Sequence, residues 1–426
     1  MAASHAAPMM TDQEWVDLNR RARANVPQWE IPALVLVALG VVGLLLGLGG
    51  NHRGLQAFWV NFLFWGGLAQ GAVTFAAAVW LTRGQWGPSV ARIALLQVAF
   101  APVMLILFLL VIVPSSGSVV PWIAHAEELH GFKGWWLSRW FMLGRDFIGL
   151  ALLTAFGLKF ASVLMRPERG ALAELRRTTL PPGWRGLEVE RAAAQASAFR
   201  WGIAVVITYM LVYSLIGFDM VMSLEPHWYS TMFGGYYFVT TLYMALAALI
   251  LWLTVLRRRM GLDGLIGPLQ YRDVGSIMLG FCILSAYTCF AQYLPIWYGN
   301  LPEEISYVLN RLDHPVWVPL VKFIVFGGFI IPLVTLINLR VKKTPAAMCL
   351  IALLILCAGF AERNVLVLPP LFPGRGETFV GPSALEALSG LLVTLGFAGL
   401  YVLSVLQGLR LGVIVPGPWR VRPFAY

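Results

Sequence analysis

Residues 31–50 read IPALVLVALGVVGLLLGLGG and contain no charged side chain. A run of about 20 apolar residues is long enough to cross the hydrocarbon core of a bilayer as an α-helix. The chain contains ten such runs, this one included, which predict membrane spans at 31–50, 56–82, 90–113, 140–165, 201–224, 234–256, 273–295, 316–339, 346–368 and 384–409. The sequence therefore predicts an all-α integral membrane protein with ten transmembrane helices.

The composition agrees with this fold class and excludes others. Hydrophobic residues make up 59% of the chain and charged residues only 12%, whereas about a quarter of the residues in a soluble domain are charged. The formal net charge is +10, but the basic residues lie in short segments between apolar runs. Such an excess is an orientation signal rather than a sign of nucleic-acid binding, so no nucleic-acid partner is expected.

Basic residues also predict the topology and the domain boundaries. Lys and Arg concentrate in both termini and in every second loop, as in the cytoplasmic segments of bacterial membrane proteins. We expect a multi-pass protein of the bacterial inner membrane, with a cytoplasmic N-terminal segment at 1–30 and a cytoplasmic tail at 412–426. The membrane domain at 31–411 carries one sizeable cytoplasmic loop, 166–200, between the fourth and fifth helices, and we expect this loop to be partly helical around residues 188–197. The first apolar run lacks a cleavage site and predicts a retained span without a signal peptide.

A faint internal repeat suggests how the helices are grouped. The fourth span begins with Trp140 followed five residues later by Arg145, and the eighth begins with Trp317 followed five residues later by Lys322. If these spans correspond, helices 2–5 and 6–9 form two four-helix bundles, with helices 1 and 10 flanking them. A Trp-plus-cation coincidence is common, so chance explains the match equally well.

No sequence pattern for a resident metal or covalent cofactor occurs. The chain has no C-x-x-C-H haem motif and no cysteine spacing typical of an iron–sulfur cluster. Its six histidines lie in tails, loops or helix ends, which disfavours an intramembrane haem. We therefore expect the metals of any redox reaction to reside in partner subunits, and no catalysis by this chain alone.

Ionisable residues inside the predicted spans mark a candidate site, because charge in hydrocarbon is costly. The predicted topology brings six of them to the same level near the outer surface: Arg145, Asp146, Asp219, Lys322, Glu362 and Arg363. Just above lies the turn 223–234, which holds Glu225 and His227 and in which Pro226 interrupts the helix. We interpret this turn as a packed re-entrant segment.

Two interpretations of this cluster remain open. Carboxylates and an imidazole can accept protons from a quinol headgroup and release them outward, so the cluster is a candidate proton path or quinol site. Alternatively, its three cations and three anions pair to hold the helices together. His227 also has a simpler interpretation, as a hydrogen-bonded residue at the membrane interface.

Two segments resemble a known family. Residues 218–234 read FDMVMSLEPHWYSTMFG and are followed by YYF at 236–238, and residues 292–304 read QYLPIWYGNLPEE. Both resemble signatures of the NrfD-like family (polysulfide-reductase membrane subunits), in particular the NrfD-like subunits of bacterial alternative complex III. The resemblance is greatest to the shorter of the two large NrfD-like subunits of that complex, and the ten spans over the whole chain agree with it.

The resemblance implies a role in a quinol:cytochrome c (electron acceptor) oxidoreductase of the respiratory chain. It implies a second NrfD-like subunit, an iron–sulfur subunit and multihaem and monohaem cytochromes c as partners, with haem and iron–sulfur clusters in those partners. Menaquinol or another quinol is the small molecule that it implies, although the family's quinol site is attributed to the longer paralogue. It assigns Asp219, Glu225 and His227 to motif positions, with proton handling as their role.

Two other functions remain alternatives. The chain can instead be a purely structural anchor for the cytochrome and iron–sulfur subunits. A stand-alone secondary transporter is a third hypothesis, which the position of the charges near one surface, rather than at the midplane, disfavours.

Overall fold

The structure is a computed structural model, and it describes residues 11–24, 27–48, 53–84, 87–124, 127, 129–263, 265–372, 381–413 and 417. Within these residues the chain forms helices and connecting segments, without a β-strand. Ten helical segments are long and apolar enough to cross a membrane, and they lie where the sequence predicted them. The prediction of an all-α, multi-pass membrane protein is therefore confirmed.

Eight of the spans are single helices: α2 (Pro27–Leu46), α3 (Arg53–Leu81), α9 (Arg139–Leu175), α10 (Leu187–Met220), α11 (Phe233–Met260), α12 (Pro268–Gly299), α17 (Pro345–Val367) and α18 (Ala384–Leu411). The third span consists of consecutive helical pieces: α4 (Pro88–Leu96), η1 (Gln97–Phe100), α5 (Ala101–Leu107), η2 (Phe108–Ile112) and α6 (Val113–Val119). The eighth consists of α14 (Trp317–Phe323), η5 (Ile324–Ile330) and α15 (Ile331–Ile337). Short π-helical turns, η2 and η5, therefore interrupt both composite spans.

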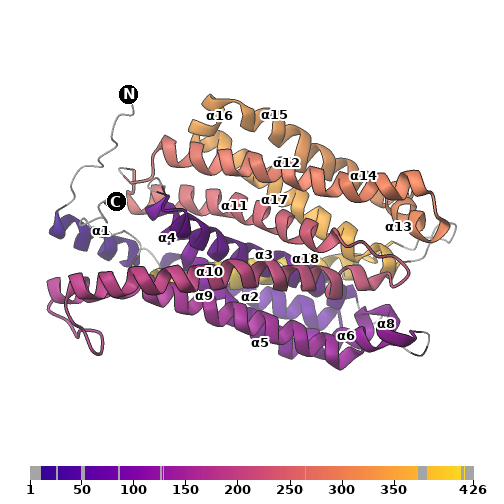
Figure 1. Cartoon of the computed structure of the whole chain (residues 1–426), viewed down its shortest axis with the longest axis horizontal. Helices are drawn as coiled ribbons and strands as arrows, with labels where there is room; N and C mark the ends of the chain where they lie inside the picture. The colour runs from indigo at the N-terminus through magenta and orange to yellow at the C-terminus, as the bar shows by residue number, and fades with distance from the viewer. Residues whose placement is uncertain are drawn as a thin grey trace.

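Short helices lie at the two ends of these spans: α1 (Asp12–Ala24), α7 (Pro121–Ala124), α8 (Gly131–Trp136), η4 (Met222–Leu224), α13 (Pro302–Leu312), α16 (Leu339–Lys343) and η6 (Pro369–Leu371). Figure 1 shows the long helices side by side, with α1 and α16 toward one end and α8 and α13 at the other. We call the end with α8 and α13 the distal end. The turn from α10 to α11 and the end of α17 also lie there.

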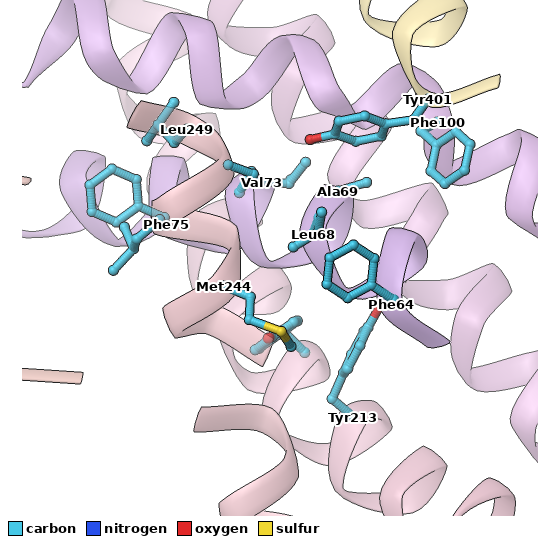
Figure 2. Packing of buried hydrophobic residues seen from close by; sticks show 14 of the residues in the cluster. Phe64, Leu68, Ala69, Val73, Phe75, Phe100, Tyr213, Met244, Leu249 and Tyr401 are labelled. Carbon is cyan, nitrogen blue, oxygen red and sulfur yellow. The ribbon is translucent and has the colours of Figure 1, made fainter. Parts of the chain in front are cut away.

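Helix α3 is the most deeply buried span. It contacts α4, α10, α11 and α18, so its side chains meet several helices at once. Figure 2 shows Leu68 and Val73 of α3 among Tyr213 of α10, Met244 of α11 and Tyr401 of α18. The core of the molecule is thus built around α3.

Small residues bring α2 and α18 into close contact. A Cβ atom added to Gly40 would lie 2.3 Å from the Cα atom of Gly396, so the two backbones touch at this point. The Ser389 hydroxyl on α18 donates a hydrogen bond of 2.7 Å to the Gly43 carbonyl. Close approach through glycine and serine is a common way for helices to associate within a membrane.

The two predicted groups of helices contact each other through α11. Helix α11 contacts α12 and α17 of its own predicted bundle, but it also contacts α3 and α10 of the other. The two Trp-plus-cation segments differ as well, since Trp140 is 70% exposed and Trp317 only 5%. The similarity between the fourth and eighth spans therefore does not extend to the surroundings of their tryptophans.

Most of the predicted loop 166–200 is helical. Helix α9 continues to Leu175 and α10 begins at Leu187, so both extend beyond their predicted spans and the connection is short. The Arg166 guanidinium on α9 donates a 2.7 Å hydrogen bond to the Glu190 carboxylate on α10. Helix α10 includes residues 188–197, where the sequence predicted helix. Hydropathy does not mark the extension of α9, which polar contacts hold against α10.

We predict that Gly40→Ala destabilises the protein through the contact between α2 and α18. The added methyl group has no room beside Gly396, and overpacking costs about 1–3 kcal/mol. Gly280→Ala on α12 is the matched control, because nothing lies within 4 Å of the added Cβ atom. The measurement is the midpoint of thermal unfolding in mild detergent. Equal midpoints for the two variants would show that the contact is loose.

Candidate functional site

The turn between α10 and α11 is packed against its surroundings, as the sequence predicted. The Trp59 indole on α3 donates a hydrogen bond of 3.0 Å to the Met220 carbonyl at the end of α10. Lys133 of α8 donates a hydrogen bond to the Pro226 carbonyl. Trp228 is buried. Neighbouring elements therefore fix the position of the turn above the intramembrane charges.

Arg145 and Asp219 form the main ion pair of the site. Arg145 on α9 donates two hydrogen bonds to the Asp219 carboxylate on α10, from Nε to Oδ2 at 2.6 Å and from Nη2 to Oδ1 at 2.5 Å. Its Nη1 donates to the Trp136 carbonyl at 2.8 Å, and the guanidinium lies 3.9 Å from the centre of the Trp136 ring. Asp219 is fully buried. This paired geometry is the strong form of a guanidinium–carboxylate contact.

Asp146 lies beside this pair, and no described group donates a hydrogen bond to its carboxylate. Its side chain is buried. Its carboxyl group is close enough to that of Asp219 for the two to interact electrostatically, and for a hydrogen bond between them when one of the two carries a proton. Arg145 therefore faces two carboxyl groups and forms hydrogen bonds with only one of them.

A second buried cluster surrounds Arg363 on α17. The adjacent Glu362 carboxylate lies 3.7 Å from Arg363 Nη1 and accepts a hydrogen bond from the Tyr236 hydroxyl of α11. Arg363 Nη2 donates to the hydroxyls of Thr240 and Thr241, at 3.1 and 2.7 Å. Hydroxyl groups of α11 thus compensate part of the cost of burying this guanidinium.

Tyr237 lies between Arg363 and the interior of the molecule. The Arg363 guanidinium is 4.2 Å from the centre of its ring, within the range of a cation–π contact. Both side chains are fully buried. The Tyr237 hydroxyl and the Nε and Nη1 atoms of Arg363 have no hydrogen-bond partner among the described residues. The second cluster therefore contains three buried polar atoms that have no hydrogen-bond partner among the described residues.

Glu225 in the turn has a partner outside the membrane spans. Its carboxylate lies 2.8 Å from Nη1 of Arg311 on α13. The Arg311 guanidinium also lies 3.6 Å from the centre of the Tyr307 ring, and Trp228 stacks on that ring at 3.6 Å. Burial raises the pKa of Tyr307 to about 12, so it is a neutral phenol. These contacts fasten the turn to α13.

The structure brings six of the eight predicted site residues into three clusters at the distal end and leaves two apart. Arg145, Asp146 and Asp219 meet; Glu362 and Arg363 meet; and Glu225 pairs with Arg311. Lys322 is exposed on α14, with no ion pair in the described part of the chain, and His227 is exposed in the turn. The sequence suggested that three cations pair with three anions. Two of these pairs are present, Arg145 with Asp219 and Arg363 with Glu362.

Two residues of the site, Tyr307 and Arg311, were not predicted from the sequence. Tyr236 and Tyr237 were noted there only as part of the motif at 218–238. Arg311 lies in a segment that the sequence assigned to a loop, and it is buried. One signal was available, because Glu225 lies in a turn without Lys or Arg and needed a cation from elsewhere. The Tyr307–Arg311 spacing of four residues is a second signal, since it places both on one face of a helix.

An apolar groove of about 410 Å³ lies between α14 and α17 near the distal end. Its lining is formed by Trp317, Leu320, Phe323, Cys357, Phe360, Ala361, Asn364 and Leu368. Asn364 follows Arg363 directly in α17. The groove therefore runs close to the second charged cluster.

The described residues contain no group of three or more His, Cys, Asp or Glu side chains that could hold a metal ion. Neither a scan of protein-family models nor a search of curated proteins finds a match to this chain.

We predict that Asp219→Asn lowers the free energy of unfolding by about 3–5 kcal/mol, because it leaves Arg145 buried without its counter-charge. The double variant Arg145→Gln/Asp219→Asn should be more stable than the sum of the two single effects implies. Asp263→Asn is the matched control, since Asp263 is exposed and forms a 2.7 Å pair with Arg257; such a pair contributes at most about 1 kcal/mol. Urea or thermal unfolding in detergent gives these values. Strictly additive single effects would exclude coupling between Arg145 and Asp219.

Proposed function

We propose that this chain is an NrfD-like membrane subunit of an alternative complex III, a quinol:electron-acceptor oxidoreductase, and that its distal charges handle the protons of that reaction. The observation that carries the proton-handling role is the placement of Asp146 beside the Arg145–Asp219 pair. The family assignment rests on the motifs at 218–238 and 292–304. Catalysis by the chain alone is not part of the proposal.

Charge balance is the reason for assigning proton handling to Asp146. Two carboxyl groups beside one guanidinium balance to neutrality only when one of them carries a proton. A buried carboxylate that accepts no hydrogen bond is costly. The Asp146 carboxylate has no donor among the described residues, so Asp146 is the natural carrier of that proton. When Asp146 loses its proton, its negative charge has no full counter-charge, because Arg145 is already paired with Asp219. The Asp146 carboxyl group is therefore suited to release and regain a proton rather than to remain charged.

The Glu362–Arg363 cluster supports the same role. Glu362 accepts a hydrogen bond from Tyr236, a side chain that can both donate and accept one. Like Asp146, it lies within a few turns of the distal end, since α17 ends at Val367. Two carboxyl groups at the same level form a short route toward that surface. In the predicted topology the distal surface is the periplasmic side.

We also propose an orientation in the membrane, a grouping of the helices and a set of partner subunits. Both termini are cytoplasmic in the bacterial inner membrane, and helices 2–5 and 6–9 form the two related bundles. The distal surface exposes aromatic side chains, Phe132, Trp135, Tyr229 and Tyr298 among them. Such residues suit a membrane-interface belt and also a docking surface for the iron–sulfur, cytochrome and second NrfD-like subunits.

The main alternative is a structural anchor without a proton-handling role. It assigns the ion pairs only to helix association, which buried pairs with good geometry can also serve. The two roles differ in what Asp146 should do. An anchor gains nothing from a second carboxyl group beside Arg145, whereas a proton carrier needs a carboxyl group that can gain and lose a proton.

We predict that Asp146→Asn slows proton release during quinol oxidation severalfold while the complex still assembles. Asparagine has nearly the same size but cannot exchange a proton. The measurement is acidification outside membrane vesicles or liposomes that contain the purified complex, per electron transferred to the acceptor. Asp263→Asn is the control. Normal proton release from a fully assembled Asp146→Asn complex would favour the anchor.

The assignment to an oxidoreductase has its own test. The tagged chain, purified in mild detergent, should copurify with c-type haem that quinol reduces, visible in a reduced-minus-oxidised spectrum. The chain has no C-x-x-C-H motif, so such bands come from partners. A folded, pure chain without these bands would contradict the complex and favour the transporter.

A second role, support of a quinol site, is favoured by the groove between α14 and α17. An apolar groove between two membrane-spanning helices suits the long isoprenoid chain of a quinol. Cys357→Trp should then raise KM for a long-tailed quinol more than for a short-tailed analogue. Leu350→Trp is the control, because Leu350 is exposed two turns away on α17 and does not line the groove. Equal effects of the two substitutions would exclude this role.

A further inference from the structure

A small cavity lies where α3, α9, α10, α11 and the third span meet. Its volume is about 10 Å³. Gln70, Thr154, Tyr213 and Tyr237 contribute its polar side chains, and the remaining lining is apolar or glycine. A cavity of roughly this size accommodates one water molecule, provided that polar partners are present.

Two of these side chains have hydrogen-bonding atoms without a partner. They are Oε1 of Gln70 and the hydroxyl of Tyr237, and both residues are at least nine-tenths buried. The Gln70 amide nitrogen is engaged elsewhere, in a long hydrogen bond of 3.4 Å to the Thr154 hydroxyl. Buried polar atoms rarely stay unpaired in native proteins, and a bound water is the usual partner when no side chain reaches them.

On one side the cavity approaches the Asp146–Asp219 pair. Leu150 of α9 and Ile216 of α10 line it. Leu150 lies four residues after Asp146 and Ile216 lies three residues before Asp219, which is about one helical turn in each case. The cavity therefore begins one turn beneath the two carboxyl groups.

On the other side the cavity reaches the Arg363 cluster through Tyr237. The side chain of Tyr237 lines the cavity, and its ring lies beneath the Arg363 guanidinium. Glu362 is the next residue of α17 and lies 3.7 Å from Arg363 Nη1. The cavity thus lies between the two ionisable clusters, in a region that is otherwise apolar.

We propose that this cavity binds one water molecule, held by Gln70 Oε1, the Thr154 hydroxyl and the Tyr237 hydroxyl, and that this water is a step in proton transfer between the two clusters. The second part rests on the proposed function. In each transfer the Asp146 carboxyl group gives a proton to the water, the water gives one to the Tyr237 hydroxyl, and that hydroxyl gives one to the Glu362 carboxylate, with which Tyr237 interacts electrostatically. The water and the tyrosine are neutral before and after, Arg363 keeps its charge, and no electron moves. Tyr213 forms part of the wall of the site.

Hydroxyl-radical footprinting tests the water site directly. Radicals generated from a bound water modify the side chains beside it, even where bulk solvent does not reach. Met104 lines the cavity and is buried, whereas Met278 is equally buried and does not line it. In the intact complex, oxidised in isotope-labelled water, we expect severalfold more label on Met104 than on Met278. Equal labelling would overturn the water site.

Two substitutions connect the label to the proposed partners. Gln70→Leu removes the amide, and Tyr237→Phe removes only the hydroxyl and keeps the ring beneath Arg363. Each should reduce labelling of Met104 and slow proton release severalfold. The matched control is Tyr243→Phe, because Tyr243 is a buried tyrosine of the same helix that bonds to the Gly328 carbonyl and does not line the cavity. If Gln70→Leu prevents folding, Tyr237→Phe provides the same test.

The outcomes separate this inference from the proposed function. Met104 labelling that depends on Tyr237, together with slower proton release in Tyr237→Phe, supports both parts of the inference. The same labelling with unchanged release would contradict the transfer step, since the water then only satisfies buried polar atoms. If Asp146→Asn leaves proton release normal, the proposed function fails, and the Met104 label still decides the water site.

Discussion

The bidentate contact between Arg145 on α9 and Asp219 on α10 is the interaction on which the distal half of the molecule depends. A charge within a membrane span is costly unless it is paired and hydrogen-bonded. Here Arg145 satisfies both carboxylate oxygens of Asp219 and a backbone carbonyl with one guanidinium. The pair therefore fixes α9 against α10 and provides the positive charge beside which Asp146 can be buried.

Close packing makes this arrangement possible. Helix α3 is buried along most of its length, and it brings α10 and α11 together around a core in which few polar atoms occur. In such surroundings each unpaired group has a large effect on its neighbours. The unpartnered oxygens of Asp146, Gln70 and Tyr237 lie in this apolar interior rather than at its surface. In the proposed function, these atoms mark stations of proton transfer from α9 past α3 to α11, within an interior that is otherwise apolar.

The sequence predicted the fold more fully than the site, for a physical reason. Apolar length determines where a helix can cross a bilayer, so ten spans could be recognised directly from hydropathy. The extension of α9 could not, because it depends on contacts such as Arg166 with Glu190. Depth along each helix predicted which charges share a level, and this brought Arg145 near Asp219. Which charges meet also depends on how each helix is rotated about its own axis, and hydropathy does not reveal that rotation. Lys322 therefore lies at the predicted depth, but its side chain faces outward.

Redox-induced infrared difference spectroscopy of the assembled complex shows whether Asp146 carries a proton. A protonated carboxyl group gives a C=O stretching band that a carboxylate does not. We expect a carboxylic-acid band that changes on quinol oxidation in the unsubstituted complex and is absent in Asp146→Asn. An unchanged band in an assembled Asp146→Asn complex would show that Asp146 does not carry the proton.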